Sequence, residues 1–321
     1  MRLPCGGNGR LSAGAAPLPA RRRAFTLVEM MVAIAVFLLM MAVIAGVMSQ
    51  TRSTVHAASA NIDLYQAARL GFDEIAQTLS HATLNTYWDY DNAAAPTNYV
   101  RKSDLQFLVS RQADSLGVFF EAPRAYSANA GYNQTTGLLN AIGYYVEYGN
   151  DTPFRPAHVA TVRWRYRLME ALQPTESLAV FSTPGSTWTD AVKALEWPLA
   201  DNVIALILWP RLSSRDDATG TKISTDYTYD SRGSVSLQLS QLPPAVQVTL
   251  VAISESSALR LNMGSTPPAA IEGALLGKFQ DATQYATDLA ALEGALDAAR
   301  VEYREFTTSV PIRESKWSGL P

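Results

Sequence analysis

The segment Arg21–Gln50, RRRAFTLVEMMVAIAVFLLMMAVIAGVMSQ, contains a single acidic residue, Glu29, just inside an otherwise apolar run. No charged residue occurs from Met30 to Thr51. At about 1.5 Å rise per residue, a helix of this length spans the roughly 30 Å hydrocarbon core of a bilayer. The run therefore predicts a membrane-spanning helix. Glu29 needs a separate explanation, because an unpaired carboxylate in such a helix is costly.

The distribution of charge separates the first 24 residues from the rest. The whole chain has 26 Lys and Arg against 29 Asp and Glu, and its 48% hydrophobic and 17% charged content is that of a folded protein. The first 24 residues contain five arginines and no acid, so the remainder has a net charge of −8. A chain this acidic lacks the basic surface of a nucleic-acid-binding protein, and we expect no nucleic-acid partner. The sole cysteine, Cys5, lies in the same segment, so the remainder has no disulfide or thiolate metal site.

Residues 1–24 have the composition of a processed leader. They are rich in Gly, Ala, Pro and Arg, lack apolar periodicity and end in three arginines directly before the apolar run. Only Arg52 follows the run closely. The positive-inside rule therefore places the N-terminus in the cytoplasm and the rest of the chain beyond the membrane.

The stretch RRRAFTLVEMMVAIAVF closely resembles the class III signal of type IV pilins and type II secretion pseudopilins. The resemblance rests on Phe25, Thr26, Leu27, Glu29 and the uninterrupted apolar run. In that family a membrane-bound prepilin peptidase cuts ahead of the phenylalanine and methylates the new terminus. Carried over, cleavage falls between Ala24 and Phe25, and Phe25 becomes the N-methylated first residue. Ala24 occupies the position at which that family usually has glycine.

Two interpretations of Glu29 remain open. A carboxylate near the end of a helix can simply reach the headgroups. Alternatively, burial of the charge costs a few kcal/mol unless the charge is paired, and the obvious partner is the terminal amine of Phe25 in a neighbouring subunit. The resemblance implies the same pairing. We favour this second interpretation, in which Phe25, Thr26 and Glu29 form the assembly site of the helix.

The whole sequence predicts an α+β fold with a long N-terminal transmembrane and stalk helix packed on a β-rich, pseudopilin-like head. Apolar residues continue to recur every three or four positions after the span, so one helix is expected from about Phe25 to about Leu79. We expect a leader at 1–24, a transmembrane half-helix at 25–50, a periplasmic amphipathic half-helix at 51–82 and a head at 83–321. The amphipathic pattern consists of Ile62, Tyr65, Ala68, Phe72, Ile75 and Leu79.

Short runs rich in Val, Ile, Tyr, Phe and Trp predict the strands of the head. A late helix is expected at 271–301 and a closing strand at 302–310, with long loops near 86–100, 121–140 and 211–233. The other predicted strands are 105–110, 116–122, 141–149, 158–170, 202–210, 234–239 and 245–254.

The residue patterns of two predicted strands indicate how each is placed in a sheet. In VRWRYRL (162–168) apolar residues alternate with three arginines, which predicts a solvated arginine face rather than an anion or nucleic-acid site. VIALILW (203–209) lacks alternation and is a candidate central strand. The three arginines are Arg163, Arg165 and Arg167.

The sequence shows no catalytic constellation, and we expect no enzyme. Three histidines are present, two of them on the stalk, and there is no GxSxG, no phosphate-binding glycine loop and no HExxH. The histidines are His56, His81 and His158.

Two loops are rich in oxygen ligands. Asp89, Asp91 and Asn92 lie close together in YWDYDNAAAPTN, and STDYTYDSRGS supplies Asp226 and Asp230. Calcium takes such ligands, but the EF-hand series is incomplete in both loops. Asx turns are the favoured interpretation, and calcium at the first loop is the one cofactor with any support.

Segments of the head narrow the resemblance. NYVRKSDLQFLV, VIALILWPR, LPPAVQVTLVAISE and VEYREFTTSVPIRESKW resemble the J-type minor pseudopilins, and TLNTYWDYDN, DYTYDSR and VPIRESKW are similar to the family called Verru_Chthon cassette protein C. The resemblance implies a structural minor subunit of a type II secretion or type IV pilus-like system. Such a subunit is a single-pass inner-membrane protein with its head in the periplasm or in a pilus-like filament. Its partners would be the prepilin peptidase, other pseudopilin-like subunits, the membrane and a secreted protein substrate.

A second function stays open, that of an adhesin or ligand-binding minor pilin. The aromatic residues Tyr87, Trp88 and Tyr90 could form a sugar-binding platform, although Trp and Tyr in a β-rich domain are more often part of the core. A membrane-tethered enzyme is the weakest of the three hypotheses, because the sequence shows no catalytic site.

Overall fold

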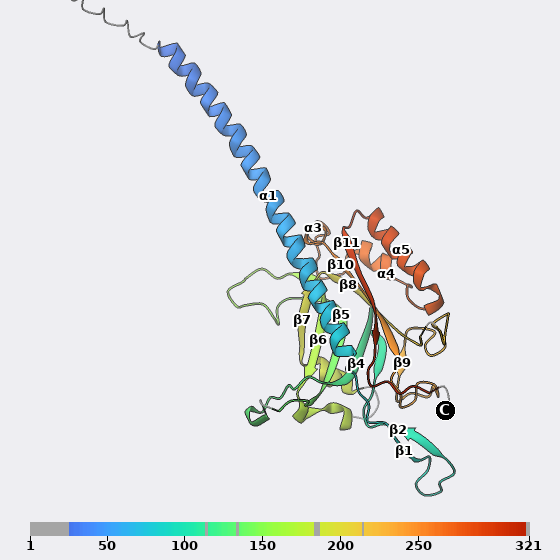
Figure 1. The fold of residues 1–321 in the computed structure, drawn as a ribbon. Coiled ribbons are helices and arrows are strands. Elements are labelled where there is room, and N and C mark those ends of the chain that lie inside the picture. Colours follow the sequence, from blue (N-terminus) through green and yellow to red (C-terminus); the bar gives the residue numbers. More distant parts are fainter. Residues whose placement is uncertain (1–25, 113–114, 133–134, 183–186, 214, 319–321) are drawn as a thin grey trace, which may run out of the picture. The chain divides into compact units, whose positions relative to one another are not determined.

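The computed structural model describes residues 26–112, 115–132, 135–182, 187–213 and 215–318 (Figure 1). The chain divides into two compact units, Met1–Val55 and His56–Pro321. The helix α1 (Leu27–Leu79) contributes to both, and the second unit is β-rich with later helices. The predicted α+β architecture is confirmed. The predicted start of α1 at Phe25 lies outside the described residues.

The first unit contains the apolar half of α1. A segment of 25 residues, Leu27–Thr51, is long and apolar enough to cross a membrane, and none of its side chains is buried within the protein. Its length at 1.5 Å per residue is roughly 37 Å, which exceeds the hydrocarbon core of a bilayer. Since the segment is apolar on every side, only a lipid or protein environment can cover it.

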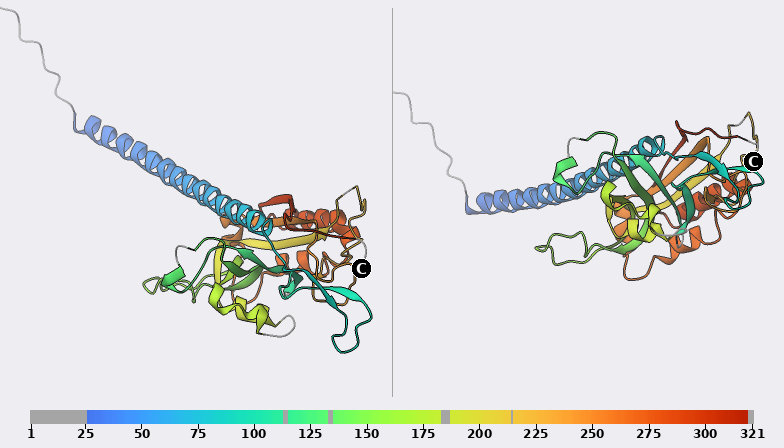
Figure 2. Two further views of the ribbon diagram at one scale, coloured as in Figure 1. Left: turned by 60° about the horizontal axis from the view of Figure 1, so that its bottom comes forward. Right: turned by 90° about the horizontal axis from the view of Figure 1, so that it is seen from below.

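The second unit contains two antiparallel sheets and a separate hairpin (Figures 1 and 2). The larger sheet has six strands in the order β7-β6-β5-β4-β3-β9, and the smaller has three in the order β11-β10-β8. The hairpin consists of β1 (Tyr87–Tyr90) and β2 (Tyr99–Lys102). The strands of the two sheets are β3 (Leu108–Gln112), β4 (Ser115–Pro123), β5 (Leu139–Asn150), β6 (Trp164–Gln173), β7 (Glu196–Asp201), β8 (Val203–Arg211), β9 (Tyr229–Asp230), β10 (Ala245–Ile253) and β11 (Tyr303–Pro311).

The C-terminal half of α1 packs onto the main hydrophobic core of the second unit. Its residues Ala68, Phe72, Ile75 and Leu79 are buried together with side chains from both sheets. Burial of each large apolar side chain contributes about 1.5–3 kcal/mol relative to exposure. An ion pair between Glu74 and Arg124, which follows β4, adds a polar contact. The amphipathic pattern predicted for this half of the helix is therefore confirmed at these positions.

A second, smaller core covers the opposite face of the six-stranded sheet. It is centred on Trp188 of helix α2 (Trp188–Lys193), which is fully buried against Phe119 and Tyr145. The Trp188 Nε1 donates a hydrogen bond of 2.8 Å to the Gln106 Oε1. Both faces of this sheet are therefore covered, which explains the long apolar runs of β4 and β5.

The predicted late helix is wrong in its extent. Two helices occupy the region, α4 (Ala269–Leu275) and α5 (Tyr285–Ala298), with a short 3₁₀ turn (Ala282–Gln284) between them. The break lies at Gly277 and Phe279, which adopt positive φ angles of 71° and 55°. A positive φ cannot continue a right-handed helix.

The strand predicted at 234–239 is also wrong, because that segment forms turns. The amides of Gln238 and Leu239 both donate to the carbonyl of Val235, and Val235 and Leu239 are exposed. Helix α2, helix α3 (Glu255–Arg260) and strand β7 were not expected from the sequence, and strands β1, β2 and β9 lie in or next to segments that were predicted to be loops.

The prediction of a solvated arginine face over residues 162–168 is wrong for two of the three arginines, which lie on β6. Arg165 and Arg167 are each only 5% exposed. The Arg165 guanidinium donates two hydrogen bonds of 2.6 Å to the Glu255 carboxylate, and the Arg167 Nε donates one of 2.9 Å to the Asp201 carboxylate. Although burial opposes it, bonding to Arg165 lowers the pKa of Glu255. The two buried guanidinium groups are therefore paired with acids of the protein, of which Glu255 is partly buried and Asp201 is exposed.

Strand β8 is buried along Val203–Pro210 but is not central in hydrogen bonding. It lies at the edge of the three-stranded sheet, and β10 is the middle strand. Strand β8 contacts β4, β5 and β6 of the other sheet, so sheet-to-sheet packing covers it. The uninterrupted apolar run of β8 therefore indicates that both faces of the strand are buried. It does not indicate where the strand lies in the order of its sheet.

Candidate membrane-anchoring and assembly site

The first turn of α1 is closed by reciprocal hydrogen bonds between Thr26 and Glu29. The Glu29 Oε2 accepts from the Thr26 amide at 2.9 Å and from the Thr26 hydroxyl at 3.0 Å, and the Glu29 amide donates to the Thr26 Oγ1 at 3.2 Å. This arrangement is a capping box, in which Thr26 caps the helix and an acid three residues later binds back. The negative carboxylate also lies at the positive end of the helix dipole.

The capping box gives Glu29 a partner within its own chain. Both Thr26 donors, the backbone amide and the hydroxyl, persist whether or not a leader is removed before Phe25. Both oxygens of a carboxylate can accept hydrogen bonds, and the two bonds that the Glu29 carboxylate accepts from Thr26 both use Oε2. The carboxylate can therefore remain in the cap and still accept from a second donor. Ala24 and Phe25, the predicted processing residues, lie outside the described residues.

The cap has a local signal in the sequence. Thr26-Leu27-Val28-Glu29 matches the S/T-x-x-E pattern that precedes an apolar run. The two interpretations of Glu29, headgroup contact and pairing with a neighbouring amine, both omitted it.

In the first acidic loop, the three predicted calcium ligands contact other protein groups. The Asp89 carboxylate forms a 2.7 Å ion pair with Lys102, which lowers its pKa. The Asp91 carboxylate accepts from the Thr97 hydroxyl and amide, and these bonds hold its pKa well below the usual range. The Asn92 Oδ1 accepts from the amide two residues later, as in an Asx turn.

In the second loop, Asp226 accepts from the amide and hydroxyl of Thr228, and Asp230 accepts from Gln106 and from the Arg232 amide. Among the residues that the structure describes, no group of three or more His, Cys, Asp or Glu side chains is placed to hold a metal ion. Calcium at Asp89, Asp91 and Asn92 stays a prediction, and these contacts compete with it.

The aromatic residues of the β1–β2 hairpin are exposed. Trp88 is 61% exposed, and Tyr87, Tyr90 and Tyr99 are also open to solvent. The Tyr90 and Tyr99 rings lie 4.8 Å apart, and the Arg101 guanidinium lies 5.9 Å from the Trp88 ring. These three aromatic side chains share one face of the hairpin with Arg101, because Trp88 pairs with Arg101 and Tyr90 with Tyr99. The hairpin lies at one end of the second unit, apart from both sheets (Figure 2).

Comparison with known proteins supports the N-terminal assignment. Residues 19–45 match the model of the prokaryotic N-terminal methylation motif. The comparisons with curated proteins and with solved structures gave no match. The motif and the apolar helix that follows it support a membrane-anchored protein of the type IV pilin-like class. The motif implies processing by prepilin peptidase and assembly with pilin-like subunits, and it is typical of structural proteins.

Proposed function

We propose that the protein is a structural minor subunit of the J-type pseudopilin kind, similar to the Verru_Chthon cassette protein C family. It is anchored in the inner membrane by α1 with its head in the periplasm, and it assembles with other pilin-like subunits of a type II secretion or type IV pilus-like system. It has no reaction of its own. The observation that carries the proposal is the coincidence of the methylation motif with the start of a helix that can span a membrane.

In this proposal Glu29 serves two partners. Its Oε2 closes the first turn through Thr26, and its carboxylate pairs with the amine of Phe25 in a neighbouring subunit. Pairing of the Glu29 carboxylate with an amine at this depth offsets most of the free-energy cost of placing an acid in the bilayer. The head then contacts neighbouring subunits or a secreted protein.

Intact-mass analysis and N-terminal sequencing test the processing step. When the chain is produced together with a prepilin peptidase, we expect a product that begins at methylated Phe25. The matched control is Phe25→Asp, which we expect to remain at full length because it puts an acid at the first position of the apolar helix. A product that retains Met1 in the presence of active peptidase, or one cut after about Ser49 as at a secretory signal, would contradict the proposal.

A second candidate function, ligand binding by the head, is favoured by the exposed hairpin. Aromatic side chains in this domain were expected to be core residues, yet Trp88, Tyr90 and Tyr99 are open to solvent on one face. Flat exposed rings next to a guanidinium suit the apolar face and hydroxyl groups of a sugar.

Glycan binding by the full chain in detergent micelles tests this candidate. We expect Trp88→Ala to weaken glycan binding about tenfold, because loss of one stacking ring costs about 1.4 kcal/mol. Trp197→Ala is the matched control, since Trp197 is also 62% exposed but lies on β7. If no glycan binds, or if both variants bind like the unmodified chain, the hairpin is not a sugar platform.

A further inference from the structure

Strand β5 extends beyond its neighbour β4. Its pairing with β6 continues to Asn150 opposite Trp164, whereas its pairing with β4 ends at Tyr144 opposite Val118. Among the described residues, the segment from Tyr145 to Asn150 therefore has a paired strand on one side only. At about 3.4 Å per residue, this free edge is roughly 20 Å long.

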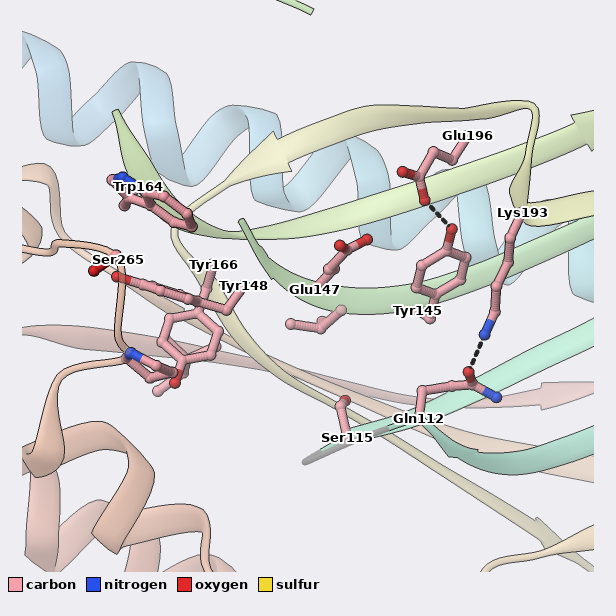
Figure 3. Close-up of a pocket in the computed structure, with 13 residues that line it drawn as sticks. Gln112, Ser115, Tyr145, Glu147, Tyr148, Trp164, Tyr166, Lys193, Glu196 and Ser265 are labelled. Atoms are coloured by element: carbon pink, nitrogen blue, oxygen red, sulfur yellow. Dashed lines mark hydrogen bonds between the residues drawn. The ribbon is translucent and has the colours of Figure 1, made fainter. Parts of the chain in front are cut away.

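The free edge exists because the start of β4 turns toward the other sheet. Ser115, the first residue of β4, is hydrogen-bonded through its hydroxyl to the amide and carbonyl of Leu206 on β8. A cavity of about 640 Å³ lies beside the free edge, with Glu147 of β5 on one side and Ser115 and Gln112 on the other (Figure 3).

The backbone of β5 presents hydrogen-bonding groups to this cavity. The amide of Asp151 donates to the carbonyl of Arg163 at 3.1 Å, in the register of the β5–β6 pairing. Since alternate residues of an antiparallel strand direct their N–H and C=O groups to opposite sides, those of Val146, Tyr148 and Asn150 point away from β6 and toward the cavity.

One wall of the cavity is aromatic. The Tyr148 ring lies 6.2 Å from the Trp164 ring and 4.7 Å from the Tyr166 ring, measured between centroids. The Tyr148 hydroxyl donates to the Gly264 carbonyl at 2.6 Å, which holds the ring in place. This wall lies on the face of β5 that carries Val146 and Tyr148.

The opposite face of β5 carries acidic groups. Burial and the nearby Glu196 carboxylate raise the pKa of Glu147. Glu196 accepts from the Tyr145 hydroxyl, and Lys193 donates to Gln112 and lies over the Tyr145 ring (Figure 3). Among the described residues neither Glu147 nor Glu196 forms an ion pair. On this face of β5, the two carboxylates lie near one ammonium group, that of Lys193.

We propose that the free edge of β5 binds an extended segment of a partner protein as an added antiparallel strand, in which apolar side chains alternate with basic ones. The backbone groups of Val146 and Tyr148 provide the hydrogen bonds, as in other cases where a peptide extends a sheet. Successive side chains of the added strand point to opposite faces, so one set meets the aromatic wall and the other meets Glu147 and Glu196. We assign the added strand the antiparallel direction that β4 has in its own pairing with β5.

Fluorescence anisotropy with a defined peptide tests the proposal on the full chain in detergent micelles. The probe is a labelled, acetylated and amidated seven-residue peptide that alternates valine with lysine. Two analogues carry N-methyl groups, one on the valine amides and the other on the lysine amides. In an antiparallel pairing the valines lie opposite Val146 and Tyr148 and direct their amides toward β5. We therefore expect valine N-methylation to abolish binding and lysine N-methylation to change it less than about threefold.

Charge reversal in the protein provides the second measurement. Glu147→Lys places a like charge beside the lysines of the peptide and is expected to weaken binding about tenfold or more. Glu272→Lys, on an exposed position of α4, is the matched control and should bind as the unmodified chain does. The proposal is overturned if the peptide does not bind at about 1 mM, if the two N-methylated analogues bind alike, or if the two charge variants bind alike. The site lies wholly within the second unit, so the outcome does not depend on membrane anchoring or assembly.

Discussion

Replacing Glu29 with alanine is expected to leave a chain that still enters the membrane but no longer joins a pilin-like assembly. Insertion depends on the apolar segment Leu27–Thr51, which the substitution makes more apolar. Assembly, in our proposal, depends on the pairing of the Glu29 carboxylate with the Phe25 amine of the next subunit. Loss of that pair should reduce the assembled fraction at least about tenfold, since a paired charge at a membrane helix end contributes about 1.4 kcal/mol or more. Membrane crosslinking followed by co-purification of other methylation-motif proteins measures the effect.

Two further variants separate the capping box from the charge pair. Glu29→Gln keeps a side-chain acceptor for the Thr26 amide but removes the charge, and Thr26→Ala removes the capping hydroxyl but keeps the charge. A lost N-cap costs about 1 kcal/mol of helix stability. We expect Glu29→Gln to assemble as poorly as Glu29→Ala, and Thr26→Ala to assemble nearly normally. If instead Thr26→Ala fails and Glu29→Gln assembles, the role of Glu29 is to cap its own helix and the intersubunit pair is wrong.

The sequence was most informative where a feature depends on local pattern. The apolar run and the recurrence of Ala68, Phe72 and Ile75 predict α1. The spacing of apolar residues indicates the period of a helix, and the length of the apolar run can be compared directly with the thickness of a bilayer. Most strands of the head were found for the same reason. Their order in the sheets could not be found, because the burial of β8 is produced by another sheet and looks the same as that of a central strand.

Features that depend on partners distant in the sequence were misread. Arg165 alternates with apolar residues in the manner of a solvated face, but its partner Glu255 lies 90 residues away. Similarly, the break between α4 and α5 depends on a positive φ at Phe279, for which a phenylalanine gives no local signal.

The candidate sites likewise include one feature that local sequence predicts and others that it does not. The Thr26–Glu29 cap could have been read from four consecutive residues. The free edge of β5 could not, because it follows from the point at which the register with β4 ends. The exposure of Trp88 also needed the structure, since a tryptophan in a β-rich domain gives no indication of which way its strand faces.

The buried residue Glu121 on β4 predicts an unusual dependence of stability on pH. Its side chain is fully buried, its Oε2 accepts from the Gln106 amide at 3.2 Å, and its Oε1 has no hydrogen-bond partner among the described residues. Burial raises its pKa to about 8, although the Arg232 guanidinium opposes the shift. The carboxyl is therefore mainly neutral at pH 7, unlike an acid in the unfolded chain.

The sign of the effect follows from proton binding. Between the ordinary pKa of 4.5 and the folded value of about 8, the folded state holds a proton that the unfolded state has lost. The free energy of unfolding therefore falls as the pH rises through this window, by up to about 1.4 kcal/mol per pH unit, and the loss is complete above pH 8. Glu121→Gln cannot ionise, so we expect it to remove this decline and to be more stable than the unmodified chain by a few kcal/mol at about pH 9.

Urea unfolding of the full chain in detergent micelles at several pH values checks this expectation, with tryptophan fluorescence, to which the fully buried Trp188 contributes, as the reporter. Glu272→Gln, at an exposed position of α4, serves as the matched control and should keep the pH dependence of the unmodified chain. Glutamine retains an acceptor for the Gln106 amide, so the two proteins should differ least near pH 5, where Glu121 is neutral when folded. If the unmodified chain and Glu121→Gln lose stability in parallel between pH 5 and pH 9, Glu121 ionises in the folded state at an ordinary pH, and water or Arg232 must reach the oxygen that here lacks a partner.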